Sequence, residues 1–123
     1  MNLVDSSAWL AFFADTRNAE KFVPPLKNVE RLLVPTIVMY EVFKVLLREK
    51  GEDAAIRAQA HMQQGTIAEL TATIAVSAAK TSIDKRLPMA DSIILATARP
   101  FDAEIWTQDE HFKGMNSVNY FPA

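Results

Sequence analysis

The sequence predicts an α/β fold in which a central, mainly parallel five-stranded sheet is covered by helices on both faces. Five short apolar, β-rich runs alternate with segments of helical character along the 123 residues. Strands that alternate with helices are joined by crossover connections, which place neighbouring strands parallel. No repeat, low-complexity tract or linker interrupts this alternation. We therefore expect a single domain over residues 1–123, long enough to bury a proper core.

The predicted strands are short apolar runs separated by helical segments and turn residues. They are expected at Asn2–Asp5, Leu32–Pro35, Thr66–Leu70, Glu104–Thr107 and Val118–Phe121.

Caps and helix breakers set the bounds of the predicted helices. The first half of the chain should hold a helix from Ser6, one around Asn18–Val23 that stops at Pro24-Pro25, and a helical turn at Leu26–Arg31. Thr36 is expected to cap a helix that reaches Lys50 and ends at Gly51. The remaining helices are expected at Glu52–Gln64 before Gly65, at Thr71–Lys85, and at Pro88–Ala98 before Pro100.

Composition excludes several classes of protein. Half of the residues are hydrophobic and 23% are charged, which is typical of a soluble globular chain and not of a disordered one. The absence of cysteine excludes disulfides, iron–sulfur clusters and thiolate zinc sites. The N-terminus has no basic start followed by a long apolar stretch, so neither a signal peptide nor a membrane span is indicated. We expect a cytoplasmic protein.

The net charge of −2 leaves nucleic-acid binding open. Taken alone it argues mildly against such binding, because nucleic-acid binders usually carry a basic excess. If several acids are collected in one pocket, however, the remaining surface is close to neutral or slightly basic. The basic residues that could then form a patch are Lys44, Arg48, Lys50, Arg57, Lys80, Lys85, Arg86 and Arg99.

Four acidic residues stand beside apolar segments, where a carboxylate loses several kcal/mol of hydration unless it is paired or bound to a metal. Asp5 and Asp109 lie at or just past the ends of predicted strands, whereas Glu41 and Asp91 are expected in the first turns of helices. In parallel sheets ligands bind beyond the carboxyl ends of the strands. The pattern therefore predicts that all four acids gather at one edge of the sheet.

Each acid also has an ordinary structural explanation. Asp5 could be a helix N-cap, or a metal-facing carboxylate oriented by the hydroxyl of Ser6 or Ser7. Glu41 could pair with Lys44 on the protein surface, although apolar neighbours argue against a solvated pair.

Asp91 is the strongest metal candidate, because its helix is apolar nearly all round and is therefore predicted to be buried. The helix dipole contributes roughly 0.3–1 kcal/mol to an acid in the first turn, too little to offset burial of a charge. Asp109 could cap a turn, and Thr107 could hydrogen-bond across the site. His111 and His61 are interpreted as ordinary residues without a site role.

The expected cation is Mg²⁺, with Mn²⁺ as a substitute, because carboxylate oxygens without cysteine or paired histidines favour hard ions over zinc. Without metal, clustered carboxylates should repel and raise the pKa of one or more of them. Several carboxylates around two ions about 4 Å apart are what two-metal phosphodiester cleavage needs, with metal-activated water as the nucleophile.

Four segments together resemble the PIN-domain ribonucleases, and among them the VapC-type toxins: Asp5–Trp9, Pro35–Val42, Leu87–Ala98 and Trp106–Phe112. The resemblance covers essentially the whole chain. It implies a three-layer α/β/α sandwich with strand order 3-2-1-4-5 and a catalytic quartet of Asp5, Glu41, Asp91 and Asp109. It also implies Mg²⁺-dependent RNA cleavage, a homodimer, and a small antitoxin that blocks the site. Two departures are His111, where some relatives carry a further acid, and Ser92, which replaces a small apolar residue.

Three other functions fit parts of the pattern. A receiver domain would need adjacent acids after the first strand and a phosphorylatable aspartate after the third, where Thr71 follows instead. A phosphatase with an aspartate nucleophile would need a second acid at the position of Ser7. A non-catalytic or RNA-processing PIN-fold binding module outside a toxin–antitoxin pair stays open, because no residue pattern reveals turnover.

Overall fold

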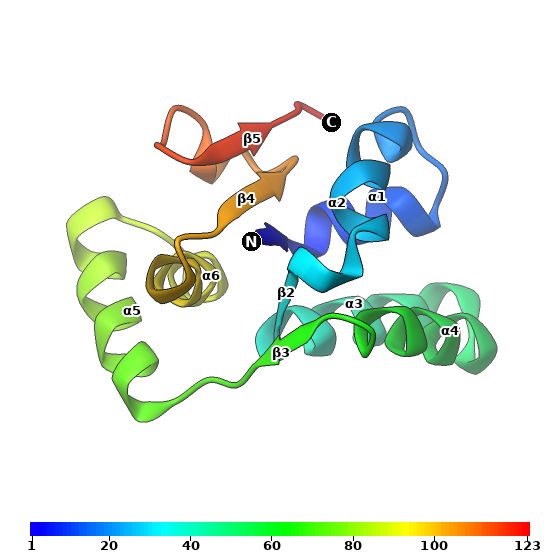
Figure 1. Cartoon of the computed structure of the whole chain (residues 1–123), viewed down its shortest axis with the longest axis horizontal. Coiled ribbons are helices and arrows are strands. Elements are labelled where there is room, and N and C mark those ends of the chain that lie inside the picture. Colours follow the sequence, from blue (N-terminus) through cyan, green and yellow to red (C-terminus); the bar gives the residue numbers. More distant parts are fainter.

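A computed structural model describes all 123 residues and forms a parallel sheet flanked by helices (Figure 1). The strands are β1 (Asn2–Val4), β2 (Leu32–Pro35), β3 (Thr66–Ala68), β4 (Glu104–Thr107) and β5 (Val118–Tyr120). Their order in the sheet is β3-β2-β1-β4-β5, and every neighbouring pair is parallel. The predicted α/β fold and the strand order implied by the PIN-domain resemblance are confirmed.

The strand order reverses at β1. The next strand along the chain, β2, pairs with one side of β1, and β4 pairs with the other side. Val4 is aligned with Trp106 of β4, so the carboxyl ends of the two strands lie side by side. This is the place where open parallel sheets bind their ligands.

The helices are α1 (Ser6–Phe13), α2 (Val23–Lys27), α3 (Thr36–Lys50), α4 (Glu52–Met62), α5 (Ala72–Lys85) and α6 (Met89–Ala98). Short 3-10 helices occupy Ala19–Phe22, Val29–Arg31, Arg99–Phe101 and Glu110–Phe112. In Figure 1, α5 and α6 lie on the left of the sheet, and α1 to α4 lie on its right. None of the helices has the length and the apolar character needed to cross a membrane.

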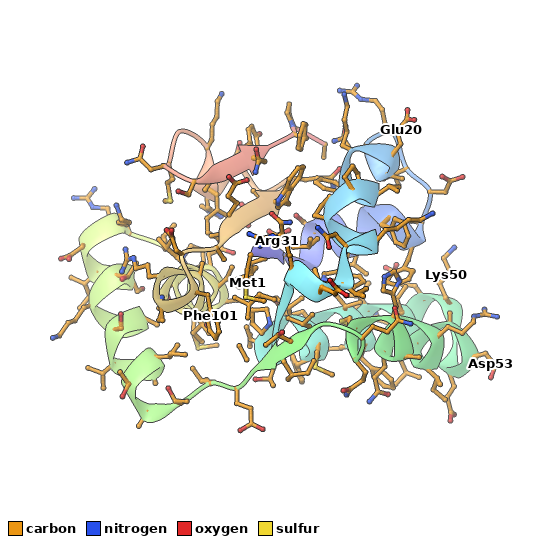
Figure 2. All side chains as sticks on the ribbon, viewed as in Figure 1. Met1, Glu20, Arg31, Lys50, Asp53 and Phe101 are labelled. Atoms are coloured by element: carbon orange, nitrogen blue, oxygen red, sulfur yellow. The ribbon has the colours of Figure 1, made fainter.

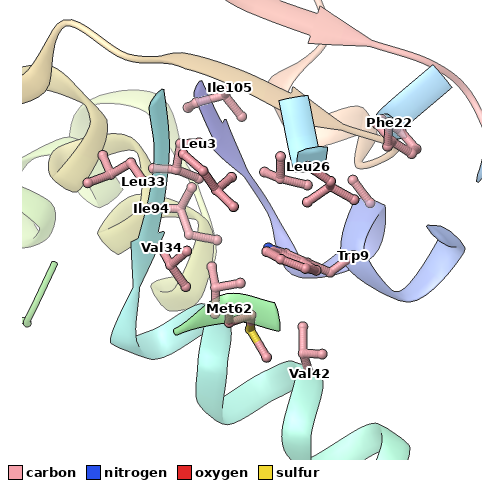
Figure 3. Packing of buried hydrophobic residues seen from close by; sticks show 14 of the residues in the cluster. Leu3, Trp9, Phe22, Leu26, Leu33, Val34, Val42, Met62, Ile94 and Ile105 are labelled. Atoms are coloured by element: carbon pink, nitrogen blue, oxygen red, sulfur yellow. The ribbon is translucent and has the colours of Figure 1, made fainter. Parts of the chain in front are cut away.

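The hydrophobic core is built from the strands and the helix faces turned toward them. Figure 3 shows Leu3 and Ile105 from β1 and β4 close together, and Trp9 of α1 among side chains of the other helices. Trp9 is fully buried, and its indole N–H has no hydrogen-bond partner. Charged side chains such as Lys50 and Asp53 project outward at the far end of the α3–α4 pair (Figure 2).

Several predicted helix ends are wrong by one or two residues, and Thr71 and Pro88 prove to be caps of α5 and α6. Two further details have a clear physical reason. Pro24-Pro25 does not stop a helix but lies in the first turn of α2, where the missing N–H donor has no intrahelical partner to lose. Thr36 is the first helical residue of α3 and not its cap. Pro35 holds the cap position with extended dihedral angles (φ −65°, ψ 142°), because β2 runs directly into the helix.

Gly65 separates α4 from β3 for a steric reason. A Cβ atom at this position would lie 2.9 Å from the carbonyl oxygen of Leu32, which is closer than side chains tolerate. The glycine therefore lets the chain pass close to β2 before β3 pairs with it. Beyond the glycine, Thr66, Ile67 and Ala68 of β3 are aligned with Leu33, Val34 and Pro35 of β2.

Candidate active site at the carboxyl ends of β1 and β4

Three of the four predicted acids meet at the reversal point of the sheet. Asp5 follows the last residue of β1, and Asp109 lies two residues beyond the end of β4. Asp91 is the third residue of α6, which packs against β4. The strand ends and the first turn of this helix therefore converge on one edge, as the sequence spacing predicts.

Asp5 is a helix cap and a buried site carboxylate at the same time. Its Oδ1 accepts hydrogen bonds from the backbone N–H of Ala8 (3.0 Å) and from the hydroxyl of Ser7 (2.7 Å). Its Oδ2 accepts a 2.6 Å bond from the hydroxyl of Thr107. The residue is only 2% exposed. A carboxylate offers about four lone-pair positions, so these three donors leave one position for a ligand.

The two hydroxyls that hold Asp5 also hold the loop after β4. The backbone N–H of Asp109 donates to Thr107 Oγ1 (2.8 Å), and that of Gln108 donates to Ser7 Oγ (3.0 Å). Each hydroxyl thus accepts a hydrogen bond from a backbone N–H of the loop and donates one to the carboxylate of Asp5. The position of Asp109 relative to Asp5 is therefore fixed by Thr107 at the end of β4 and by Ser7 in the first turn of α1.

Asp91 lies in a helix that is buried along almost its whole length. Every residue of α6 from Asp91 to Ala98 is buried, and Asp91 itself is 8% exposed. Its Oδ2 lies 3.1 Å from Nδ1 of His111. The expected burial of this acid is therefore observed, and its nearest charge-bearing neighbour comes from the loop after β4.

His111 belongs to the site, contrary to the interpretation of it as a surface residue. Asp109 caps the short helix Glu110–Phe112 by accepting from the backbone N–H of His111 (2.9 Å). This turn folds the ring back, so that Nδ1 also lies 2.8 Å from Asp109 Oδ1. Half of the ring is exposed, yet its inner nitrogen stands between two carboxylates. The spacing of two residues from Asp109, in a turn that Asp caps, is the sequence signal for this contact.

Burial sets the protonation of the two innermost acids. Burial raises the pKa of Asp91 to about 7, repulsion from Asp109 adds to the increase, and the positive charge of His111 opposes it. Burial also raises the pKa of Asp5 to about 6, against hydrogen bonds from Thr107, Ser7 and Ala8 that stabilise the charged form. Both directions are those expected of carboxylates crowded together without a cation.

Glu41 lies in the second turn of α3, one turn later than predicted, and faces the start of α1. The hydroxyl of Ser6 donates a 2.9 Å hydrogen bond to Glu41 Oε1. Glu41 and Lys44 do not form an ion pair. The Lys44 ammonium lies 5.5 Å from the centre of the Tyr40 ring instead. Of the two serines after Asp5, one therefore holds Asp5 and the other holds Glu41.

A divalent cation fits the innermost group. One carboxylate oxygen each from Asp91 and Asp109 and one ring nitrogen of His111 lie within 4.8 Å of one another. Asp5 is joined to this group through the hydroxyl of Thr107. A donor set dominated by carboxylate oxygen suits a hard ion, with the imidazole as an additional nitrogen donor.

His61 has a different setting. Its ring lies edge-on to Trp9 (5.2 Å between ring centres) and its Nε2 lies 3.0 Å from the carbonyl oxygen of Leu26. This histidine packs under α2 and takes no part in the acidic group.

Comparison with known sequences assigns the family. The sequence profile of the PIN domain matches residues 3–117, nearly the whole chain. The chain is a PIN domain. The resemblance drawn from the four sequence segments is thereby confirmed. No curated protein sequence matches the chain.

Solved structures share this PIN fold over almost their full lengths. A toxin–antitoxin complex from Klebsiella pneumoniae has a TM-score of 0.85 at 21% identity, covering 100% of both chains. VapC20 of Mycobacterium tuberculosis, described as a sarcin–ricin loop cleaving toxin, has a TM-score of 0.79 at 18% identity, covering 94% of this chain and 95% of that one. VapBC2 of Rickettsia felis, bound to a DNA fragment from its promoter, has a TM-score of 0.71 at 14% identity, covering 98% and 97%.

Proposed function

We propose that this PIN domain is a metal-dependent endoribonuclease and the toxin of a toxin–antitoxin pair. Asp5, Glu41, Asp91 and Asp109 would be its catalytic residues. The observation that carries the proposal is the meeting of three of these acids at the reversal point of the sheet, with two of them buried. Ionised carboxylates at such a place need a cation, and burial raises the pKa of Asp5 and Asp91 in its absence.

Mg²⁺, or Mn²⁺ in its place, fits the oxygen-rich donors, and Asp91, Asp109 and Asp5 would hold it. When bound, such an ion lowers the pKa of a water molecule and neutralises charge on a phosphodiester. The chain supplies the rest of the site. Ser7 and Thr107 keep Asp5 oriented, and Ser6 engages only one oxygen of Glu41. The other oxygen, Oε2, is available to accept a proton from a nearby water.

The RNA substrate and the protein partner are inferred from what the structural neighbours are said to do. One of them is described as cleaving the sarcin–ricin loop, and others are toxin–antitoxin complexes. We therefore propose a structured RNA as the substrate, recognised by its shape, and a small antitoxin protein that covers the site. A homodimer and a cytoplasmic location complete the proposal.

The decisive experiment is cleavage of structured RNAs by the purified chain after any partner has been removed by denaturation and refolding. We expect cleavage with Mg²⁺ or Mn²⁺ and none with EDTA, and sequencing of the RNA ends would identify the preferred site. If a refolded, metal-loaded preparation binds RNA but never cuts it, the chain is a binding module and the nuclease proposal fails.

The antitoxin partner is tested separately by expression of the chain alone and together with the protein encoded beside it. We expect growth arrest from the chain alone and relief with the neighbour, which should co-purify as a stable complex. Unimpaired growth with an actively cleaving enzyme would remove the toxin role and leave the ribonuclease activity.

A further inference from the structure

We propose that His111 is a direct ligand of the catalytic ion through Nδ1, and that this nitrogen shifts the preference of the site from Mg²⁺ toward Mn²⁺. The inference rests on the proposed metal site and assigns it a ligand that the acidic quartet does not contain. It starts from the position of Nδ1 between two acids, 2.8 Å from Asp109 Oδ1 and 3.1 Å from Asp91 Oδ2.

These separations match those of neighbouring ligands around one ion. In an octahedral site with metal–ligand bonds of about 2.1 Å, adjacent ligand atoms lie roughly 3 Å apart. The Nδ1 atom therefore already lies at this spacing from each carboxylate oxygen, and all three atoms lie within 4.8 Å of one another. A cation can take up all three with small movements of the side chains.

The backbone holds the ring in this orientation. The N–H of His111 donates to Asp109 Oδ1, which fixes the short helix Glu110–Phe112 at the position of Asp109. The next residue, Phe112, is fully buried and anchors the same turn in the core. The ring directs its Nδ1 toward the two acids, while about half of the side chain remains exposed.

A nitrogen ligand changes which ion is bound best. Mg²⁺ is a hard ion that prefers oxygen ligands and gives up its water reluctantly. First-row transition ions accept imidazole more readily, and their affinity for sites with nitrogen donors increases from Mn²⁺ onward. A site with His111 in place of an additional acid should therefore bind Mn²⁺ better, relative to Mg²⁺, than an all-carboxylate site.

Two other roles for His111 are physically distinct. The protonated ring could serve as a counter-charge to Asp91 and Asp109 that leaves when an ion binds, or its outer nitrogen could contact the RNA. In both cases Nδ1 is not bonded to the ion. The distinction can be measured without following catalysis.

The test is pulsed electron paramagnetic resonance of the full chain loaded with Mn²⁺, which detects nitrogen bonded to the ion. The chain has only two histidines, so ¹⁵N labelling of histidine identifies the source. We expect nitrogen coupling that changes with the label, disappears in His111→Ala, and is retained in the matched control His61→Gln. Loaded wild-type protein without nitrogen coupling, or a coupling that survives in His111→Ala, would overturn the assignment.

Binding constants give a second readout. For His111→Ala we expect the Mn²⁺ dissociation constant to rise by about tenfold or more, with a smaller rise for Mg²⁺, and His111→Asp should favour Mg²⁺ over Mn²⁺ relative to wild type. Equal weakening of both ions would overturn the selectivity. RNA cleavage with either ion, without nitrogen coupling, would leave the proposed function intact and reject only the role of His111. A chain that binds neither ion would reject both.

Discussion

The hydroxyl of Thr107 donates a 2.6 Å hydrogen bond to Asp5 Oδ2 and so joins the carboxyl end of β4 to that of β1. The same hydroxyl accepts from the backbone N–H of Asp109. One side chain thus orients a buried carboxylate and fixes the loop that carries a second one. Thr107 is therefore the structural link between Asp5 and Asp109 in this PIN domain.

Thr107→Val should disrupt the site, although valine has nearly the same size and shape as threonine. The substitution removes the hydroxyl from Asp5 and leaves the N–H of Asp109 without its partner. We expect a loss of about 1–3 kcal/mol in the free energy of unfolding. The pKa of Asp5 should move further above about 6, because the Thr107 hydrogen bond lowers it. Urea unfolding of the metal-free protein measures the first effect, and NMR titration of the carboxyl group measures the second.

Thr97→Val is the matched control for this experiment. Thr97 is equally buried, but its hydroxyl only bonds back to the carbonyl of Ile93 within α6. Its removal leaves no other polar group without a partner, so the loss of stability should be smaller and the pKa of Asp5 unchanged. Equal effects of the two variants would show that Thr107 has no special link to the acids.

The metal-free protein should become less stable as the pH rises from about 4 to about 7. The pKa of Asp5 is raised from 3.8 to about 6 and that of Asp91 from 3.8 to about 7. The folded state therefore binds protons more tightly than the unfolded state in this window, and raising the pH favours unfolding. For Asp5 alone the difference corresponds to about 3 kcal/mol. Urea unfolding at a series of pH values in EDTA measures this slope, which Asp5→Asn should reduce.

Asp91→Asn should stabilise the metal-free protein at pH 8, although it removes a site residue. The substitution abolishes a buried charge that repels Asp109, and site residues are commonly retained at the expense of stability. We expect a higher melting temperature than wild type at pH 8 and little difference at pH 5, where Asp91 is already protonated. Added Mg²⁺ should raise the melting temperature of wild type and have little effect on the variant. A variant less stable than wild type at pH 8 would contradict this account of the charge.

Glu41→Gln should reduce RNA cleavage by at least about tenfold, in the range of a lost general base, with little change in folding. Glu41 is hydrogen-bonded by Ser6 at the start of α1 and is not paired with Lys44. The control on the same helix is Glu49→Gln, since Glu49 forms an exposed pair with Arg48. Initial cleavage rates of the three proteins decide the matter. Unchanged cleavage in Glu41→Gln would remove Glu41 from the site.

Much of the fold is readable from the sequence because the strands are short apolar runs with helices between them. The bounds of β2 and β4 are predicted to the residue, since Pro35 and Thr107 each end an apolar run. The other three strands end one or two residues early. Asp5 lies beyond β1 as the cap of α1, while its backbone N–H still donates to the carbonyl oxygen of Trp106 in β4 (3.1 Å).

The acidic site is only partly predictable from the sequence, because contacts between side chains far apart in the sequence produce no clear local pattern. Asp5, Asp91 and Asp109 follow from their places at strand and helix ends. The sequence could not say which of Ser6 and Ser7 would hold Asp5, since both can reach a neighbouring carboxylate. His111 was not predicted as a site residue. The sequence alone does not show that the turn after Asp109 directs Nδ1 of this half-exposed ring toward the acids.

Whether these acids form one hydrolytic site is tested most directly by cleavage of a structured RNA with Mg²⁺. The single-turnover rate is measured for wild type and for Asp91→Asn. We predict metal-dependent cleavage by wild type and a rate at least about 100-fold lower for the correctly folded variant, the scale seen when one electrostatic contribution to catalysis is removed. Equal rates for the two proteins would contradict the site.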